Sequence, residues 1–123
     1  MNTWSPEDLA LLAAHDSLVL TAGDGDRDGV EIGMVVVHGA LYVRAYRGVR
    51  SRWYQAAREH GRGRIRVGTV AREVLLETGA AGAAAEIDAA YRTAYGTPAA
   101  ALVASPGARA ATIRIHPAPT HLI

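Results

Sequence analysis

The sequence of 123 residues contains no cysteine, no lysine and no long apolar run. The lack of cysteine excludes disulfides and thiol chemistry. The longest apolar runs, such as Met34–Val37, fall far short of the ~20 residues that a helix needs to cross a bilayer. Glu7 and Asp8 stand near the start of the chain, where a secretion signal would carry basic residues. We therefore expect a cytoplasmic protein that does not enter a membrane.

The absence of lysine means that all 13 basic residues are arginine. Together with the abundant alanine and glycine, this bias is typical of a GC-rich genome. The choice of arginine over lysine is therefore weak support for bidentate recognition at any one position. The arrangement of the arginines along the chain is more informative than their identity.

Several catalytic and metal-binding patterns are also missing. The five histidines show no spacing typical of metal ligands. No nucleophile-elbow pattern marks a Ser-His-Asp set, and Gly61–Arg64 lacks the lysine and the spacing of a phosphate-binding P-loop. The acidic loop Gly23–Gly29 lacks the distal glutamate of a calcium loop, so we predict a hairpin connection there. No metal site is expected.

The length and composition are those of a single domain. Half of the residues are hydrophobic and a fifth are charged, which is typical of a globular chain. A chain of this size buries one core but not two independent cores. We predict one domain over residues 1–123.

Capping residues and hydrophobic periodicity predict the order of elements. Helices are expected after the capping residues Ser5 and Ser51 and over 83–95. Strands are expected at 17–21, 30–38, 41–46, 63–67, 69–77 and 111–116. Segment 97–104 is ambiguous, and a turn is expected at 105–107. About six strands with two or three covering helices predict an α+β or mainly β fold, as a small barrel or a strongly curved antiparallel sheet.

Two strand segments carry specific expectations about burial. The Met34–Val37 run predicts a strand that is buried on both faces. Segment 41–46 alternates, so its odd-numbered apolar residues are expected on one face and its even-numbered residues on the other. The even-numbered residues are Tyr42, Arg44 and Tyr46.

Residues 44–66 concentrate the positive charge of the chain. They contain eight arginines and one acid, Glu59, which gives this segment a net charge of +7, whereas the whole chain carries +1. Segregated charge of this kind raises the local positive potential and favours an anionic ligand. The eight arginines are Arg44, Arg47, Arg50, Arg52, Arg58, Arg62, Arg64 and Arg66.

A subset of this segment is predicted to bind a phosphate-bearing small molecule. At the start of the helix that Ser51 caps, the first backbone N–H groups have no partner within the helix. Free N–H groups, a hydroxyl and flanking guanidiniums suit a phosphate group, and aromatic residues in the first helical turn could add a stacking surface or a hydrogen bond. The predicted site residues are Arg44, Tyr46, Arg47, Arg50, Ser51, Trp53 and Tyr54.

Simpler structural roles compete with this interpretation. Arg58 and Arg62 are expected to be ordinary solvent-facing charges. Arg64 and Arg66 line one face of a strand, and the sequence leaves open whether they belong to the site. A tryptophan such as Trp53 is more often a core anchor than a platform for a ligand.

The segments Leu41–Gly48 and Ser51–Tyr54 resemble a family of small uncharacterised bacterial proteins, a domain of unknown function. The similarity continues through Gly61–Arg66, the helix around Ile87–Tyr91 and the segment from Ser105 to Arg114, so it covers most of the chain. That family is in turn similar to the flavin-binding split barrels, which include the pyridoxamine-phosphate-oxidase-like proteins and the deazaflavin-dependent nitroreductases. This second similarity depends on the strand order and on the Trp-Tyr turn.

The resemblance implies a split barrel over residues 1–123, a cofactor and a homodimer. It implies FMN or a deazaflavin, bound by the predicted site residues named above. Gln55-Ala-Ala57 after the aromatic pair departs from the nitroreductase pattern. We therefore expect a flavin- or deazaflavin-binding protein, with an oxidoreductase acting on a small molecule as the corresponding enzyme class.

Two other functions are weighed against this one. The first is a non-enzymatic module that binds an anion or an acidic partner on a split barrel without a cofactor. The second is nucleic-acid binding, which the basic segment permits. The nearly neutral net charge and the lack of a helix-turn-helix, zinc or RNP signature argue against nucleic acid.

Overall fold

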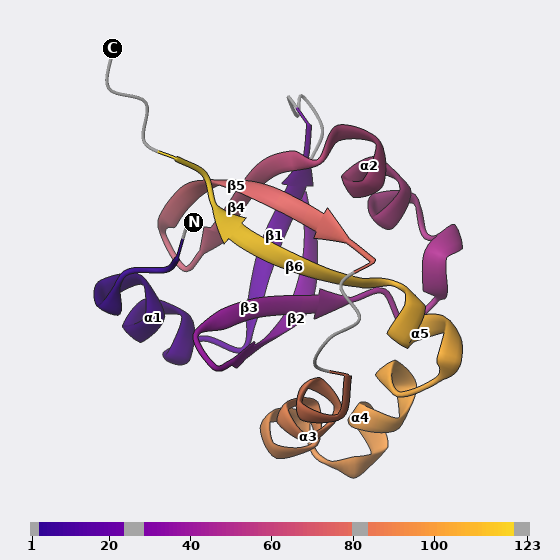
Figure 1. The fold of residues 1–123 in the computed structure, drawn as a ribbon. Coiled ribbons are helices and arrows are strands. Elements are labelled where there is room, and N and C mark those ends of the chain that lie inside the picture. Colours follow the sequence, from indigo (N-terminus) through magenta and orange to yellow (C-terminus); the bar gives the residue numbers. More distant parts are fainter. Residues whose placement is uncertain (1–2, 24–28, 80–83, 120–123) are drawn as a thin grey trace.

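The computed structural model describes residues 3–23, 29–79 and 84–119 (Figure 1). Six strands form a barrel. The strands are β1 (Ser17–Ala22), β2 (Val30–Val37), β3 (Ala40–Arg44), β4 (Arg62–Val67), β5 (Val70–Thr78) and β6 (Thr112–Pro117). Every neighbouring pair is antiparallel, and the order β1-β2-β3-β6-β5-β4 closes on itself. The expected small α+β barrel of six strands is therefore confirmed.

Helices surround this barrel. They are α1 (Pro6–Ala13), the 3-10 turn η1 (Gly48–Arg50), α2 (Arg52–His60), α3 (Ala84–Tyr95), α4 (Thr97–Val103) and α5 (Pro106–Ala110). In Figure 1, α3 and α4 lie together beside β2 and β3, whereas α1 and α2 lie at different ends of the barrel. The described part of the chain thus has more helices than the two or three expected from the sequence.

The helix starts follow the capping rules. Ser5 precedes α1 and its Oγ accepts a hydrogen bond from the Asp8 N–H at 3.1 Å, while Pro6 occupies the first helical position. Ser51 caps α2 in the same way, and Gly61 ends α2 with a left-handed φ of 67°. Ser105 caps α5, so the expected turn at 105–107 opens a short helix instead.

Two hydrophobic clusters lie on the two sides of the barrel wall. The interior cluster includes Leu41, Val43 and Ala45, with Trp4 among its members. The Trp4 indole N–H donates to the Ile115 carbonyl at 3.0 Å, which fixes the start of the chain against β6. The outer cluster lies beneath α3 and α4 and buries residues of β2 and β3 together with residues of the helices. Of the described strands, β2 and β3 are the two whose outer side is buried by a hydrophobic cluster.

The two expectations about burial have different outcomes. The alternation is confirmed over β3, because Leu41 and Val43 belong to the interior cluster and Tyr42 to the outer one. The strand ends at Arg44 and not at residue 46 as expected, so Tyr46 lies in the following turn and is exposed. All five residues of β3 are nevertheless buried, since α3 and α4 cover the outer face. The prediction for Met34–Val37 is wrong at Val36, which is 37% exposed while its three neighbours are buried.

Strands β2 and β3 separate at one end of the barrel. Their register runs from Val37–Ala40 to Met34–Val43 and stops there. Residues 30–33 of β2 continue alongside β1, whereas Arg44 pairs with Thr112 of β6. The two strands therefore diverge beyond Met34 and Val43, and this divergence positions the candidate site.

Candidate functional site: a cavity where β2 and β3 diverge

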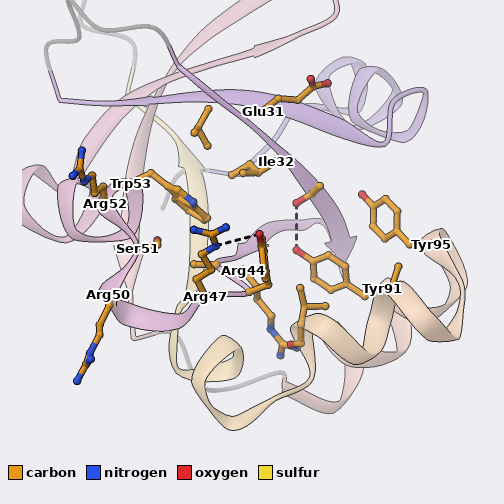
Figure 2. Close-up of a pocket in the computed structure, with 16 residues that line it drawn as sticks. Glu31, Ile32, Arg44, Arg47, Arg50, Ser51, Arg52, Trp53, Tyr91 and Tyr95 are labelled. Carbon is orange, nitrogen blue, oxygen red and sulfur yellow. Dashed lines mark hydrogen bonds between the residues drawn. The ribbon is translucent and has the colours of Figure 1, made fainter.

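A cavity of ≈780 Å³ lies between the separated ends of β2 and β3, the start of α2, and helices α3 and α4 (Figure 2). Its volume falls in the range of about 300–1,000 Å³ that is usual for small-molecule sites. The residues that line it are Val30, Glu31, Ile32, Gly33, Arg44, Ala45, Tyr46, Arg47, Arg50, Ser51, Arg52, Trp53, Tyr91, Tyr95, Ala99 and Val103. Six of the seven predicted site residues are among them, and Tyr54 is not.

Arg44 is a buried member of the predicted site, and its guanidinium is held by protein groups. Its side chain is 0% exposed and forms an ion pair with Asp88 of α3. Its Nε donates to the Thr112 hydroxyl at 3.0 Å, and its Nη1 also donates to the Val103 carbonyl at 3.0 Å. A guanidinium with these partners stabilises the cavity wall. Its charge is compensated by Asp88, so it contributes little to binding an anionic ligand.

Asp88 is shared between two arginines. It also pairs with Arg109 of α5, whose side chain is 48% exposed. Burial alone would raise the pKa of the Asp88 carboxyl, but the hydrogen bonds and charges of Arg44 and Arg109 outweigh burial and lower it. Asp88 is therefore ionised at neutral pH and ties α3 to β3 and α5.

Of the arginines predicted for the site, Arg47 is the one whose guanidinium faces the cavity. No carboxylate among the described residues forms an ion pair with it. It is exposed, and its Nε donates to the Tyr46 hydroxyl at 3.2 Å. The guanidinium carbon also lies 5.6 Å from the centre of the Tyr46 ring, within the reach of a cation–π contact. Figure 2 shows this guanidinium directed toward the middle of the cavity.

The start of α2 forms the wall beside Arg47. The Ser51 Oγ accepts from the Tyr54 N–H at 3.3 Å, so it acts as the helix cap. Helix geometry leaves the N–H groups of Arg52 and Trp53 without partners within α2. The Trp53 side chain packs against the interior cluster, as expected of a core anchor, and the residue also lines the cavity.

Three predicted residues contribute less to the cavity. Tyr54 is buried at 4% exposure, and its hydroxyl donates to the Ala110 carbonyl at 3.5 Å, outside the lining. The Arg50 side chain points away from the cavity in Figure 2, although the residue lines its margin. Tyr46 is 56% exposed at the rim.

Tyr91 and Tyr95 of α3 form the opposite wall, and no sequence signal assigned them to a site. The Tyr91 hydroxyl donates to the Gly33 carbonyl at 3.3 Å, and the Tyr95 hydroxyl donates to the Met34 carbonyl at 2.7 Å. Burial raises the pKa of both phenols above the usual value, and their mutual proximity adds to the effect on Tyr91. Both phenols therefore stay neutral donors at neutral pH. In the sequence, the spacing of four residues along α3 indicates only that the two tyrosines lie on the same side of the helix.

The remaining arginines lie outside the cavity lining. Arg64 is on the outer face of β4 and pairs with Glu73 of β5 at 2.7 Å, with both side chains more than 60% exposed. Arg58, Arg62 and Arg66 are also exposed. The basic segment is thus divided between the cavity and a separate surface formed by α2 and β4.

Neither a cluster of metal-ligating side chains nor a membrane-crossing helix is found among the described residues. No group of three histidine, aspartate or glutamate side chains is placed to hold a metal ion within 3–23, 29–79 and 84–119. None of the helices in these ranges has the length and apolar character needed to cross a membrane. The acidic loop considered as a calcium site lies mostly outside the described residues.

A comparison with protein-family models matches residues 8–115 to the family described as an uncharacterized protein conserved in bacteria (DUF2255). This match covers most of the sequence, and the chain belongs to that family. No curated protein and no solved structure matches the chain significantly. The family membership predicted from the sequence is therefore confirmed, while the relation to the flavin-binding split barrels stays a prediction.

Proposed function

We propose that this bacterial protein binds a flavin or a deazaflavin in the cavity between β2 and β3. The observation that supports the proposal most strongly is that one cavity combines aromatic side chains with a cationic group. The aromatic side chains belong to α2 and α3, and the cationic group is Arg47 beside the start of α2. A flat aromatic ring with an anionic tail matches both.

The anionic tail would be held by Arg47, Ser51 and the N-terminus of α2. Arg47 supplies a charged donor, and the Arg52 and Trp53 N–H groups supply backbone donors at the positive end of a helix dipole. The Ser51 hydroxyl accepts one bond as a cap and keeps its own hydrogen for a ligand. Arg44 is assigned to the wall, because Asp88 already neutralises it.

The ring would be held by Trp53, Tyr91 and Ile32. Trp53 and Tyr91 lie on different walls of the same cavity, and Tyr91 is fixed by its bond to Gly33. Stacking on fixed aromatic rings stabilises a planar ligand by about 0.5–1.5 kcal/mol per pair beyond the burial of apolar surface. The cavity volume also suits a ligand of this size.

A bound flavin or deazaflavin would supply hydride or electron transfer to a small molecule. The chain would contribute binding, orientation and exclusion of water. Among the described residues that line the cavity, Glu31 is the one that carries a carboxylate, and this carboxylate accepts a hydrogen bond from the Ser17 hydroxyl at 2.9 Å. Protein acid–base groups are not needed for transfer from the ring itself, which suits this lining. The homodimer implied by the resemblance stays a prediction.

One observation favours a second function, a module that binds an anion without a cofactor. Of the arginines predicted for the site, Arg44 is neutralised and Arg50 points outward, so the charge directed into the cavity is smaller than the sequence indicated. A single phosphate or carboxylate ligand would need no more than Arg47 and the start of α2.

Titration of the purified protein with FMN and with a 5-deaza analogue of FMN tests the proposal, with fluorescence of the ligand as the measurement. We expect binding that weakens by about tenfold or more in Arg47→Ala, because a charge-assisted hydrogen bond is lost. Arg58→Ala is the matched control, since Arg58 lies on α2 but outside the cavity. Binding of inorganic phosphate without binding of either ring compound would favour the second function.

A further inference from the structure

The wall of the cavity includes a strand edge that none of the described strands covers. The register of β2 with β3 begins at Met34–Val43, and Glu31 lies three residues before that point. On its other side Glu31 faces Val19 of β1. The β3 side of β2 at Glu31 therefore opens on the cavity, which Glu31 lines.

The pairing pattern gives the direction of the Glu31 backbone groups. The Met34 N–H donates to the Asp16 carbonyl at 3.1 Å, so Met34 directs its groups toward β1. Neighbouring residues along a strand direct theirs to opposite sides, and antiparallel ladders alternate in the same way. Glu31, an odd number of residues from Met34, therefore directs its N–H and C=O away from β1 and toward the cavity. No hydrogen bond to either group is found within the described residues.

The Glu31 side chain is turned elsewhere. Its carboxylate accepts the Ser17 hydroxyl and points away from the cavity in Figure 2. The adjacent Gly33 carbonyl accepts the Tyr91 hydroxyl, which brings an aromatic ring against the same edge. What a ligand meets at Glu31 is thus an adjacent backbone donor and acceptor, beside a tyrosine ring.

We propose that the Glu31 backbone reads an imide edge of the ligand ring, in which an N–H lies between two carbonyl groups. One ring carbonyl would accept from the Glu31 N–H, and the ring N–H would donate to the Glu31 C=O. Flavins and 5-deazaflavins both carry this edge on the pyrimidine ring. The inference rests on the proposed function, and it adds a reason why the site would select such rings over other flat anions.

The test compares FMN with FMN methylated at N3, the nitrogen of the imide. Methylation removes the ring N–H and blocks the edge, so we expect the dissociation constant to rise at least about tenfold. Glu31→Pro removes the backbone N–H on the cavity side, where proline breaks no bond of the β1–β2 ladder. Glu31→Ala keeps that N–H and removes only the carboxylate, so it is the matched control.

Supporting results are strong discrimination between the two ligands by the wild type and Glu31→Ala, with weaker FMN binding and reduced discrimination in Glu31→Pro. Equal binding of both ligands by the wild type would overturn the inference and leave the proposed function standing. No binding of either ligand would overturn both. If Glu31→Pro does not fold, the ligand comparison on the wild type and Glu31→Ala decides.

Discussion

The guanidinium of Arg44 is completely removed from solvent and forms an ion pair with Asp88, 44 positions further along the chain. The pair joins the end of β3 to α3 at the base of the cavity. It changes the meaning of the arginine-rich segment, because its first arginine is a structural residue of the cavity wall. Arg47, three positions later, is the arginine that remains directed into the cavity.

Replacement of Arg44 by alanine is expected to lower the free energy of unfolding by about 2–3 kcal/mol. Loss of one partner from a buried ion pair leaves the other without its counter-charge. We expect an effect smaller than is usual for a buried pair, because Asp88 is partly exposed and keeps Arg109 as a second partner. Arg47→Ala is the control and should change stability by less than about 0.5 kcal/mol. Urea denaturation measures both. Equal effects of the two substitutions would contradict the distinct roles given to these arginines.

The stability of the protein is expected to fall in acid partly through Asp88. The Arg44 and Arg109 contacts lower the Asp88 pKa relative to the unfolded chain, so the folded state binds fewer protons at this group. Its contribution is complete above the unfolded-state pKa of about 4 and is lost as the pH falls through the lower folded-state value. Asp88→Asn should be less stable at neutral pH and should show a shallower decline below about pH 4. Parallel pH curves for wild type and variant would contradict this role.

Gly63 of β4 is expected to tolerate no side chain. A Cβ at this position would lie 2.2 Å from the Thr21 carbonyl oxygen, a backbone atom of the neighbouring strand β1. Gly63→Ala should therefore destabilise the barrel by about 3 kcal/mol or more, since the clash lies at a strand pair that closes it. Thermal unfolding is a suitable measurement.

Gly107 offers the opposite result as a control. It lies in α5, and a Cβ there would have no neighbour within 4 Å in the part of the chain that the structure describes. Gly107→Ala should stabilise the protein by about 0.5–1 kcal/mol, because alanine loses less conformational entropy in a helix. A stabilising Gly63→Ala would show that the β1–β4 contact is not as close as described.

The elements of the barrel could be predicted from the sequence because their signals are local. Ser51 and Gly61 mark the two ends of α2, and alternation marks β3 and β4. The outer cover was not predictable in the same way. The α3 residues that bury β2 and β3 lie about 50 positions away, and alternation alone does not show whether a polar face meets solvent or a helix. The exposure of Val36 has another cause. Val36 pairs with Leu41 of the interior cluster and so lies on the inner side of β2, and an apolar run does not show where burial on that side ends.

The candidate site was predictable in its location but not in its division of roles. Charge segregation and the helix cap indicated the segment around Arg47 and Ser51, where the cavity is found. The partner of Arg44 was not predictable, because Asp88 is one of several acids and nothing local connects the two. Tyr91 and the free edge at Glu31 depend on where β2 and β3 separate, which is a property of the closed barrel.

The proposed binding of a flavin-type ring in the cavity between β2 and β3 is tested most directly by backbone amide NMR shifts mapped during FMN titration. We predict saturable shifts that concentrate at Glu31, Arg47 and Trp53 and leave the amides around Arg64 and Arg66 on β4 nearly unchanged. Shifts confined to the β4 surface, or no saturable shift at high micromolar FMN and 5-deaza-FMN, would contradict the claim.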